Sequence, residues 1–400
     1  MKKIIIIGGG ASGFFAALRH KALFPENEVI ILEKLGNVLA KVKISGGGRC
    51  NVTHACFEPK ELVKFYPRGS KELLSPFSRF HAAHTVAWFE EREVALKVEE
   101  DGRMFPQSNE SQTIIDALTG EAERLGVEVH LHTGVKNILQ TADGFEITTN
   151  RKTYLAHSVM MATGSSPQMW ELLEKLGHHI EKPVPSLFTF HIKDERLKEL
   201  AGISVPQVEA KIVGEKITQT GALLITHWGL SGPAILRLSA WGARVLAEKS
   251  YQFRMQLNFV PQHSLETLTR YFLENKKQFA KKQVASNPFF ELPLRLWRKL
   301  VAAAKLDDTL IWADISKIQL IALCEQLTQA LFEVTGKSTF KEEFVTCGGV
   351  SRKEIQFKTM ESKIVPQLFF GGEVIDIDAI TGGFNFQAAW TTGWIAGENL

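Results

Sequence analysis

Four residues near the N-terminus have the types and spacing to bind the phosphates and sugar of a nucleotide. Gly8, Gly10 and Gly13 form a G-x-G-x-x-G, and Glu33 follows Gly13 by 20 residues. In this motif the first glycine permits a tight turn, the second lets the backbone approach a pyrophosphate, and the third lets a helix pack on a strand. A carboxylate such as Glu33 accepts hydrogen bonds from ribose hydroxyls and disfavours a 2′-phosphate, so the motif predicts FAD or NAD rather than NADP.

The elements that must position these residues are also visible in the sequence. Residues 3–7 form a short apolar run typical of a parallel strand that is buried on both faces. Apolar residues spaced by three and four predict a helix from Ala11 to about Leu23, and a second strand is expected at residues 29–32. A helix that begins at the glycines directs free N–H groups and positive dipole towards phosphate. The order of these elements predicts a Rossmann-like α/β domain with a central parallel sheet.

Three later segments favour FAD over NAD. Gly46, Gly47 and Gly48 form a run without side-chain bulk that can pass close to phosphate or to a flat ring, and Lys41 and Arg49 flank it. An apolar strand expected at residues 154–162 ends in Ala162-Thr163-Gly164. Gly382 and Gly383 precede an expected C-terminal helix, whose N-terminus could stabilise negative charge on a reduced flavin. Each glycine cluster could instead be an ordinary turn.

The same segments resemble a known bacterial family. The sequences SGGGRCN (residues 45–51), ATG (162–164) and GGEVIDIDAITGGFNFQ (371–387) are similar to those of the BaiN-like flavoproteins, also called aminoacetone-oxidase-like. The resemblance spans nearly the whole chain. Two departures stand out, because Ala40 replaces a basic residue that is usual in the family and Ser165 replaces a second glycine. The family implies one FAD, bound by a two-part domain that a second domain interrupts.

Motif and resemblance together predict the following FAD contacts, with no metal ligands: Gly8, Gly10, Ala11, Ser12, Gly13, Glu33, Lys34, Lys41, Ser45, Gly46, Gly47, Arg49, Cys50, Asn51, Val135, Ala162, Thr163, Gly164, Gly372, Glu373, Asp378, Gly382, Gly383, Asn385, Phe386 and Gln387.

The expected domain organisation follows the composition of each stretch. Residues 1–187 and 346–400 are expected to form the two parts of the FAD-binding domain. Residues 188–345 are expected to form an inserted substrate or cap domain, β-rich over 188–260 and helical over 261–335. Within the helical stretch, Ser316 and Gln319 have the spacing of a capping box at a helix start.

Composition excludes several classes of protein. The net charge of +3, from 47 basic and 44 acidic residues, argues against a nucleic-acid partner. No apolar run approaches the length of a membrane span. Four cysteines in 400 residues do not make a disulfide framework, so we expect a cytoplasmic protein. Of the four cysteines, Cys50 and Cys56 lack the spacing of a redox disulfide, and the sequence contains no second G-x-G-x-x-G for a resident nicotinamide cofactor.

These features predict an FAD-dependent oxidoreductase that acts on a small organic molecule. The resemblance suggests NAD(P)H-linked reduction of a conjugated C=C bond, with NAD(P)H docking transiently, or oxidation of an aminoketone by oxygen. His227 is a candidate acid or base and Arg103 a candidate substrate-orienting group, although a structural histidine and a surface ion pair are the competing interpretations. The sequence also leaves open a flavoprotein that acts on RNA or has no enzymatic role, and an NAD dehydrogenase without flavin.

Overall fold

The computed structural model describes residues 1–338 and 345–400, and the chain divides into two compact units. The discontinuous unit contains Met1–Val184 and Val345–Leu400, and the inserted unit contains Pro185–Phe344. The boundaries expected from the sequence lie at residues 187/188 and 345/346, within three residues of this division.

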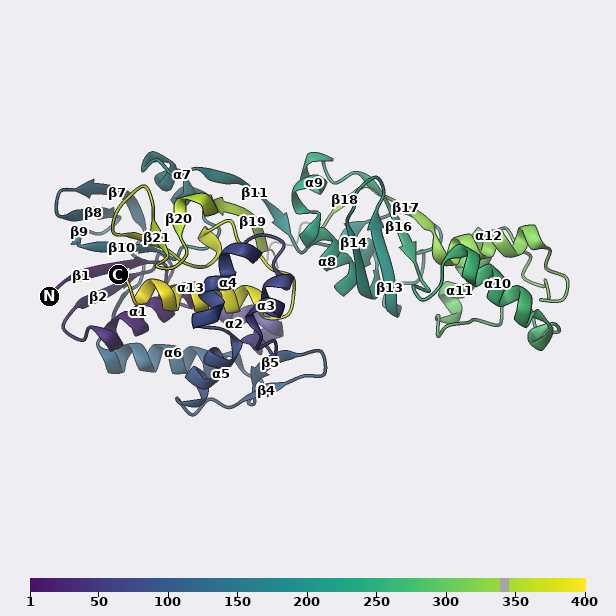
Figure 1. Cartoon of the computed structure of the whole chain (residues 1–400), viewed down its shortest axis with the longest axis horizontal. Coiled ribbons are helices and arrows are strands. Elements are labelled where there is room, and N and C mark those ends of the chain that lie inside the picture. The colour runs from purple at the N-terminus through teal and green to yellow at the C-terminus, as the bar shows by residue number, and fades with distance from the viewer. Residues whose placement is uncertain (339–344) are drawn as a thin grey trace. The chain divides into compact units, whose positions relative to one another are not determined.

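A seven-stranded sheet forms the centre of the discontinuous unit (Figure 1). Its strands are β20 (Ile355–Gln356), β21 (Glu361–Ser362), β22 (Leu368–Phe370), β10 (Ser158–Met161), β1 (Lys3–Ile7), β2 (Glu28–Leu32) and β6 (Glu128–His130), in that order. The five from β22 to β6 are parallel. Ile4, Ile5 and Ile6 are fully buried, because a parallel sheet is covered on both faces. The predicted parallel sheet is confirmed.

Helices α1 (Ala11–Leu23) and α13 (Phe384–Gly397) lie side by side in this unit. Small residues let their backbones approach closely. A Cβ atom added at Gly393 would lie 2.4 Å from the carbonyl oxygen of Ser12, and one added at Gly397 would lie 2.5 Å from that of Ala16. The C-terminal helix is therefore fixed against the helix that follows the first glycine motif.

The other elements of the discontinuous unit surround this sheet. The helices are α2 (Ala40–Gly48), α3 (Pro59–Leu62), α4 (Ser70–Arg79), α5 (Ala82–Glu90), α6 (Ser111–Leu125) and α7 (Pro167–Lys175). The strands are β3 (Thr53–His54), β4 (Leu96–Val98), β5 (Arg103–Pro106), β7 (Val135–Thr141), β8 (Gly144–Thr149), β9 (Thr153–Ala156), β11 (Ile180–Ser186) and β19 (Val345–Val350).

The single strand predicted over residues 154–162 is wrong, because the chain changes sheets within it. Strand β9 pairs antiparallel with β8, and β10 then enters the parallel sheet beside β1. His157 lies between them and is held by Lys3, whose N–H donates to the His157 ring at 2.9 Å and whose carbonyl accepts the His157 N–H at 2.9 Å. The apolar run therefore continues through a change of partner that periodicity does not reveal.

The inserted unit contains an antiparallel sheet and a group of helices. The sheet order is β17 (Ala330–Val334), β16 (Phe253–Asn258), β13 (Ser204–Ile212), β14 (Thr218–Thr226), β15 (Gly229–Ser231), β12 (Phe190–His191) and β18 (Gly336–Lys337). Its helices are α8 (Pro233–Trp241), α9 (Ala243–Glu248), α10 (Leu265–Asn275), α11 (Leu294–Ala303) and α12 (Lys317–Thr328). Helix α12 begins at the expected capping box, in which Ser316 and Gln319 exchange hydrogen bonds of 3.3 and 3.0 Å.

The helical stretch expected over residues 261–335 is wrong at its C-terminal end. Residues Ala330–Val334 form strand β17, in which buried and exposed side chains alternate. Leu331 is 47% exposed, whereas Phe332 is buried beneath the sheet. The period of two decides the structure here, although Leu331 also fits the spacing of the preceding helix. Across the described residues, no helix combines the length and apolar character that crossing a membrane requires.

Candidate cofactor-binding site

The turn between β1 and α1 has the geometry that its three glycines predict. Gly8 adopts φ of +112°, and a Cβ atom there would lie 2.4 Å from the carbonyl oxygen of Ala162. A Cβ atom on Gly13 would lie 2.1 Å from the Gly8 carbonyl oxygen, whereas one on Gly10 would meet nothing within 4 Å. Gly8 and Gly13 are therefore required by the fold, and Gly10 faces open space at the N-terminus of a 13-residue helix. This is the position that a pyrophosphate needs.

Glu33 lies at the end of β2 and is oriented by two backbone groups. Its carboxylate accepts the Gly9 N–H at 2.9 Å and the Leu35 N–H at 2.8 Å. Lys34 is exposed beside it, and the turn before β7 packs here, because a Cβ atom on Gly134 would lie 3.7 Å from the Lys34 side chain. Val135, the first residue of β7, follows this turn and is buried. The structure thus brings Glu33, Lys34 and Val135 to one edge of the glycine turn.

The glycine run after Lys41 interrupts α2. Ser45 leaves the helical conformation, and Gly46, Gly47 and Gly48 all have positive φ. Cβ atoms on Gly47 and Gly48 would meet nothing within 4 Å, so this backbone also borders open space. Gly48 is absent from the predicted contacts, although the third glycine of the run carries the same signal as the other two.

The two cations that flank this run both have acidic partners. Lys41 forms an ion pair with Glu373 of the C-terminal segment. The Arg49 guanidinium lies 2.6 Å from the Glu99 carboxylate and 4.0 Å from the ring centroid of Phe105. Their charges are therefore partly balanced within the protein, and their predicted contact with the pyrophosphate stays a prediction.

Cys50 follows Arg49 and is fully buried with φ of +61°. Burial raises the pKa of its thiol to about 12, with a smaller opposing effect from a hydrogen bond to Ser45. A thiolate is disfavoured at such a site, which argues against a redox role for this thiol.

The strand β10 brings Ala162, Thr163 and Gly164 next to the first glycine turn. The Ala162 N–H donates to the Ile7 carbonyl at 2.9 Å. The buried hydroxyls of Thr163 and of Ser12 have no hydrogen-bonding partner among the described residues. A buried polar atom without a partner destabilises a protein by about 1–3 kcal/mol. Ser12 follows Gly10 by two residues on α1 and Thr163 lies beside Gly8, so both hydroxyls are polar groups that a ligand at this turn can partner.

The C-terminal glycine pair caps α13. Gly383 is the residue before the helix and has φ of +90°. In the orientation that satisfies both of its groups, the Asn51 amide accepts the Gly383 N–H at 2.9 Å and donates to the Thr53 carbonyl at 3.0 Å. A Cβ atom on Gly372 would lie 3.3 Å from the Ser12 side chain. The C-terminal segment therefore contacts both earlier glycine motifs.

Three of the predicted polar contacts in this segment are engaged inside the protein. The fully buried Asp378 forms an ion pair with Arg68, a partner that no sequence signal indicates. Asn385 holds the Ala379 backbone through hydrogen bonds of 2.9 and 3.1 Å. Gln387 is fully buried, and its amide oxygen accepts from two threonine hydroxyls at 2.6 and 2.9 Å. These side chains therefore position the glycine pair, while Phe386 is half-buried on the first turn of α13.

The two candidate catalytic residues lie in different units. Arg103 begins β5 in the discontinuous unit and forms ion pairs with Asp101 at 2.7 Å and Glu99 at 3.2 Å. His227 lies exposed in the turn between β14 and β15 of the inserted unit. Its ring makes no hydrogen bond to any of the described residues, so the interpretation as a satisfied structural histidine has no contact to support it.

The residues present fit FAD. Its phosphates and flavin require open backbone, which the structure has at Gly10, Gly47 and Gly48. Its ribose requires an oriented carboxylate, which is Glu33. Its polar atoms also find hydroxyls without a partner among the described residues, at Ser12 and Thr163. The fold and the site define an FAD-dependent oxidoreductase with a Rossmann-like domain.

Family comparison places the chain within this class. The HI0933-like protein Rossmann domain family matches residues 2–399, so the chain belongs to that family. The resemblance to BaiN-like flavoproteins is thereby confirmed.

Curated relatives match over almost their full length. The chain is 30% identical to "Ribosomal RNA dihydrouridine synthase" of Escherichia coli (strain K12), covering 99% of this chain and 97% of the relative. It is 28% identical to the protein of the same name from Haemophilus influenzae, with 98% and 96% covered. It is 26% identical to "3-dehydro-bile acid delta(4,6)-reductase" of Clostridium scindens, with 100% and 98% covered.

Solved structures of a reductase and of a dehydrogenase share this fold. A flavocytochrome c3 fumarate reductase aligns with a TM-score of 0.51 at 15% identity, covering 100% of this chain and 78% of that chain. A 3-ketosteroid-delta4-(5alpha)-dehydrogenase from Rhodococcus jostii RHA1 aligns with a TM-score of 0.50 at 11% identity, covering 99% and 96%. At such low identity these likenesses establish the fold alone.

Proposed function

We propose that this flavoenzyme reduces a C=C bond conjugated to a carbonyl group, with NAD(P)H as the electron donor. The observation that carries the proposal is the shared chemistry of the relatives that match the whole chain. Dihydrouridine differs from uridine by saturation of the C5=C6 bond, which is conjugated to a ring carbonyl. A delta(4,6)-reductase is likewise named for double bonds that it saturates. One bond type therefore unites substrates that otherwise differ greatly.

We further propose that the substrate is a uracil base in RNA. Two full-length relatives carry that activity in their names, at 30% and 28% identity. The near-neutral net charge argues against a nucleic-acid partner only if charge is spread evenly, and in this chain it is unevenly distributed. A steroid-like enone is the second candidate, supported by the relative at 26% identity.

Protein groups would supply the proton and hold the substrate. FAD, when bound and reduced by NAD(P)H, would supply the hydride, and saturation of the C=C bond also requires one proton at the neighbouring carbon. We assign this proton to His227, because its ring is exposed and no described residue engages it. Arg103 of the discontinuous unit, with a side chain 38% exposed, is the alternative candidate to contact the substrate, as a hydrogen-bond donor to its carbonyl.

Anaerobic stopped-flow absorbance tests the proposal with the FAD-loaded protein. NADH or NADPH should bleach the visible flavin band, and in-vitro-transcribed ribosomal RNA should restore it. Mass spectrometry of the digested RNA should then show a uridine that has gained two hydrogens. His227→Asn should slow the reoxidation step at least tenfold while leaving bleaching by NAD(P)H unchanged.

Three outcomes would point to a different function. Reoxidation by a 3-oxo-4,6-diene bile acid but not by RNA would keep the bond type and replace the substrate. Bleaching by aminoacetone, with no response to NAD(P)H, would replace the proposal with an amine oxidase. A flavin that neither nicotinamide nor amine bleaches would indicate a non-enzymatic role.

A further inference from the structure

Positive charge is concentrated in one short part of the inserted unit. Residues 270–305 contain nine Lys or Arg and two Asp or Glu, a net charge of +7. Because the whole chain carries +3, the remaining residues together carry −4. The net charge of the whole chain is therefore near zero although this segment is strongly basic. A local concentration of positive charge of this kind is typical of a surface that binds a polyanion.

At least four of the nine basic side chains of this segment are exposed and form no ion pair with a described residue. Lys277 lies in a short 3-10 turn after α10, and Lys281 and Lys282 follow it. Arg298 lies on the outer face of α11, whose opposite face buries Trp297. Within residues 1–338 and 345–400, none of these four cations has an ion pair. An unpaired cation keeps its full charge for a ligand.

The two stretches that carry these cations are held together. The indole N–H of Trp297 donates to the Val284 carbonyl at 2.7 Å, which attaches α11 to the chain two residues after Lys282. The backbone N–H of Trp312 donates to the Lys282 carbonyl at 3.0 Å, which fixes the same stretch to a residue of the buried core. We call Lys277, Lys281, Lys282 and Arg298 the basic surface.

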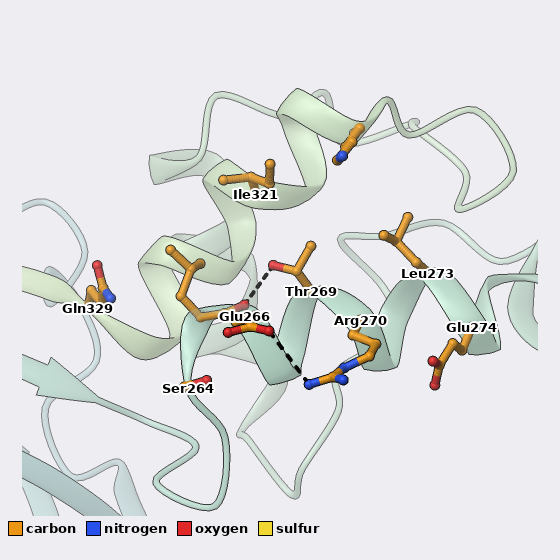
Figure 2. Close-up of a pocket in the computed structure, with 10 residues that line it drawn as sticks. Ser264, Glu266, Thr269, Arg270, Leu273, Glu274, Ile321 and Gln329 are labelled. Atoms are coloured by element: carbon orange, nitrogen blue, oxygen red, sulfur yellow. Dashed lines mark hydrogen bonds and ion pairs between the residues drawn. The ribbon is translucent and has the colours of Figure 1, made fainter.

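A nearby groove has a different character. A groove of about 790 Å³ lies between α10 and α12. Figure 2 shows Glu266 and Glu274 among its lining residues. Glu266 lies 3.9 Å from Arg270, so the one labelled cation in the view is paired with an acid. Glu266 and Glu274 balance the charges of Arg270 and Lys317 in the lining, so the groove has no excess of positive charge and the basic surface does.

We propose that the basic surface contacts the phosphate backbone of RNA and holds the substrate while a base is reduced. This inference rests on the proposed action on RNA and adds to it the surface that binds the polyanion. Lysine and arginine contacts of this kind give affinity without reading sequence, and they release counterions, so the binding must weaken with salt. Target selection would then come from groups that contact the base itself.

RNA binding by the FAD-loaded full chain tests the inference. Fluorescence anisotropy with a labelled 20-nucleotide oligouridine would be measured from 50 to 300 mM KCl for the wild type and for K281Q/K282Q/R298Q. Loss of three phosphate contacts should lower the slope of log Kd against log[KCl] by about 2, and at 0.1 M salt this corresponds to an affinity loss on the order of 100-fold.

A matched control separates local contact from overall charge. K60Q/K71Q/K136Q removes three exposed lysines from the discontinuous unit, so the net charge changes by the same amount. This variant should bind RNA as the wild type does. Both variants should retain FAD and be bleached by NAD(P)H at the wild-type rate.

The possible results separate the inference from the proposed function. If both triple variants bind oligouridine equally well, or if the wild type does not bind it, the proposal that the basic surface contacts RNA is refuted. If the surface variant loses binding to vesicles of phosphatidylserine and phosphatidylcholine but not to RNA, the partner is a membrane and the inference is also overturned. If oligouridine binding depends on the surface but no dihydrouridine forms, the RNA surface stands and the proposed reaction fails.

Discussion

The open space at Gly10 gives a sharp test of the cofactor site. Gly10→Ala adds one methyl group where the structure has no atom within 4 Å, at a residue whose φ of −95° suits alanine. The apoprotein should therefore fold normally, with a loss of about 0.5–1 kcal/mol because alanine is a poor residue before a helix. The same methyl group would occupy the space that the pyrophosphate requires.

The expected effect on FAD binding follows from the hydrogen bonds at risk. Displacing the pyrophosphate by the width of a methyl group would remove one or two charge-assisted bonds from backbone N–H groups at the start of α1. Each such bond contributes roughly 1.5–3 kcal/mol. We expect a loss of about 2–4 kcal/mol, which raises the Kd for FAD by roughly 30-fold to 1,000-fold.

Titration of the apoprotein with FAD, followed by quenching of flavin fluorescence, measures this change, and urea unfolding of the apoprotein measures stability. Gly120→Ala is the matched control, because it makes the same substitution in open space within α6. It should stabilise the protein by up to about 1 kcal/mol and leave FAD affinity unchanged. An unchanged Kd in Gly10→Ala would refute the placement of the pyrophosphate at this turn.

Three further predictions follow from packing and charge. Gly13→Ala would put a methyl carbon 2.1 Å from the Gly8 carbonyl oxygen, so it should destabilise the apoprotein by more than about 3 kcal/mol in urea unfolding. Hydrogen bonding to Arg124, followed by Arg92, lowers the pKa of Glu121 from 4.5 to about 2. The contribution of this carboxylate, on the order of 2 kcal/mol after a discount for solvent screening, should be complete above pH 4.5 and lost as the pH falls towards 2. Glu121→Gln should therefore destabilise the protein at pH 6 but have little effect near pH 2. Of the four cysteines only Cys56 is not buried, so the native protein should release one equivalent of thiol to a disulfide reagent at pH 8 and Cys56→Ser should release none.

The first glycine motif could be predicted because its signals are local. The helix expected from Ala11 to about Leu23 is observed at Ala11–Leu23, and Gly8 and Gly13 have the close backbone contacts that the motif implies. Because the strand, the turn and the helix follow one another directly, the residues that determine them are consecutive in the sequence. The distance in sequence from the glycine motif to Glu33 depends only on the length of one βαβ unit, so the position of Glu33 at the end of β2 was also predictable.

The partners of the C-terminal residues could not be predicted, because they lie far away in the sequence. Arg68 neutralises Asp378 across 310 residues, and Thr53 donates to Gln387 across 334. Charge and hydrogen-bonding capacity suggest that Asp378 and Gln387 contact a ligand, but only the fold reveals that the protein itself satisfies both side chains. Net charge has a related weakness, since a sum over the chain cannot report where the charges lie.

The connection between the two units explains how the cofactor site tolerates an insertion. Strands β11 and β19, which lead into and out of the inserted unit, pair with each other, so the two ends of the insertion are held together. The two stretches of the discontinuous unit then meet through Ser12 and the Gly371–Gly372 backbone, and through Asn51 and Gly383. Because all of these contacts lie within one unit, substitutions at the basic surface should leave FAD binding intact. That independence is what allows RNA binding and flavin reduction to be measured separately in the same variant.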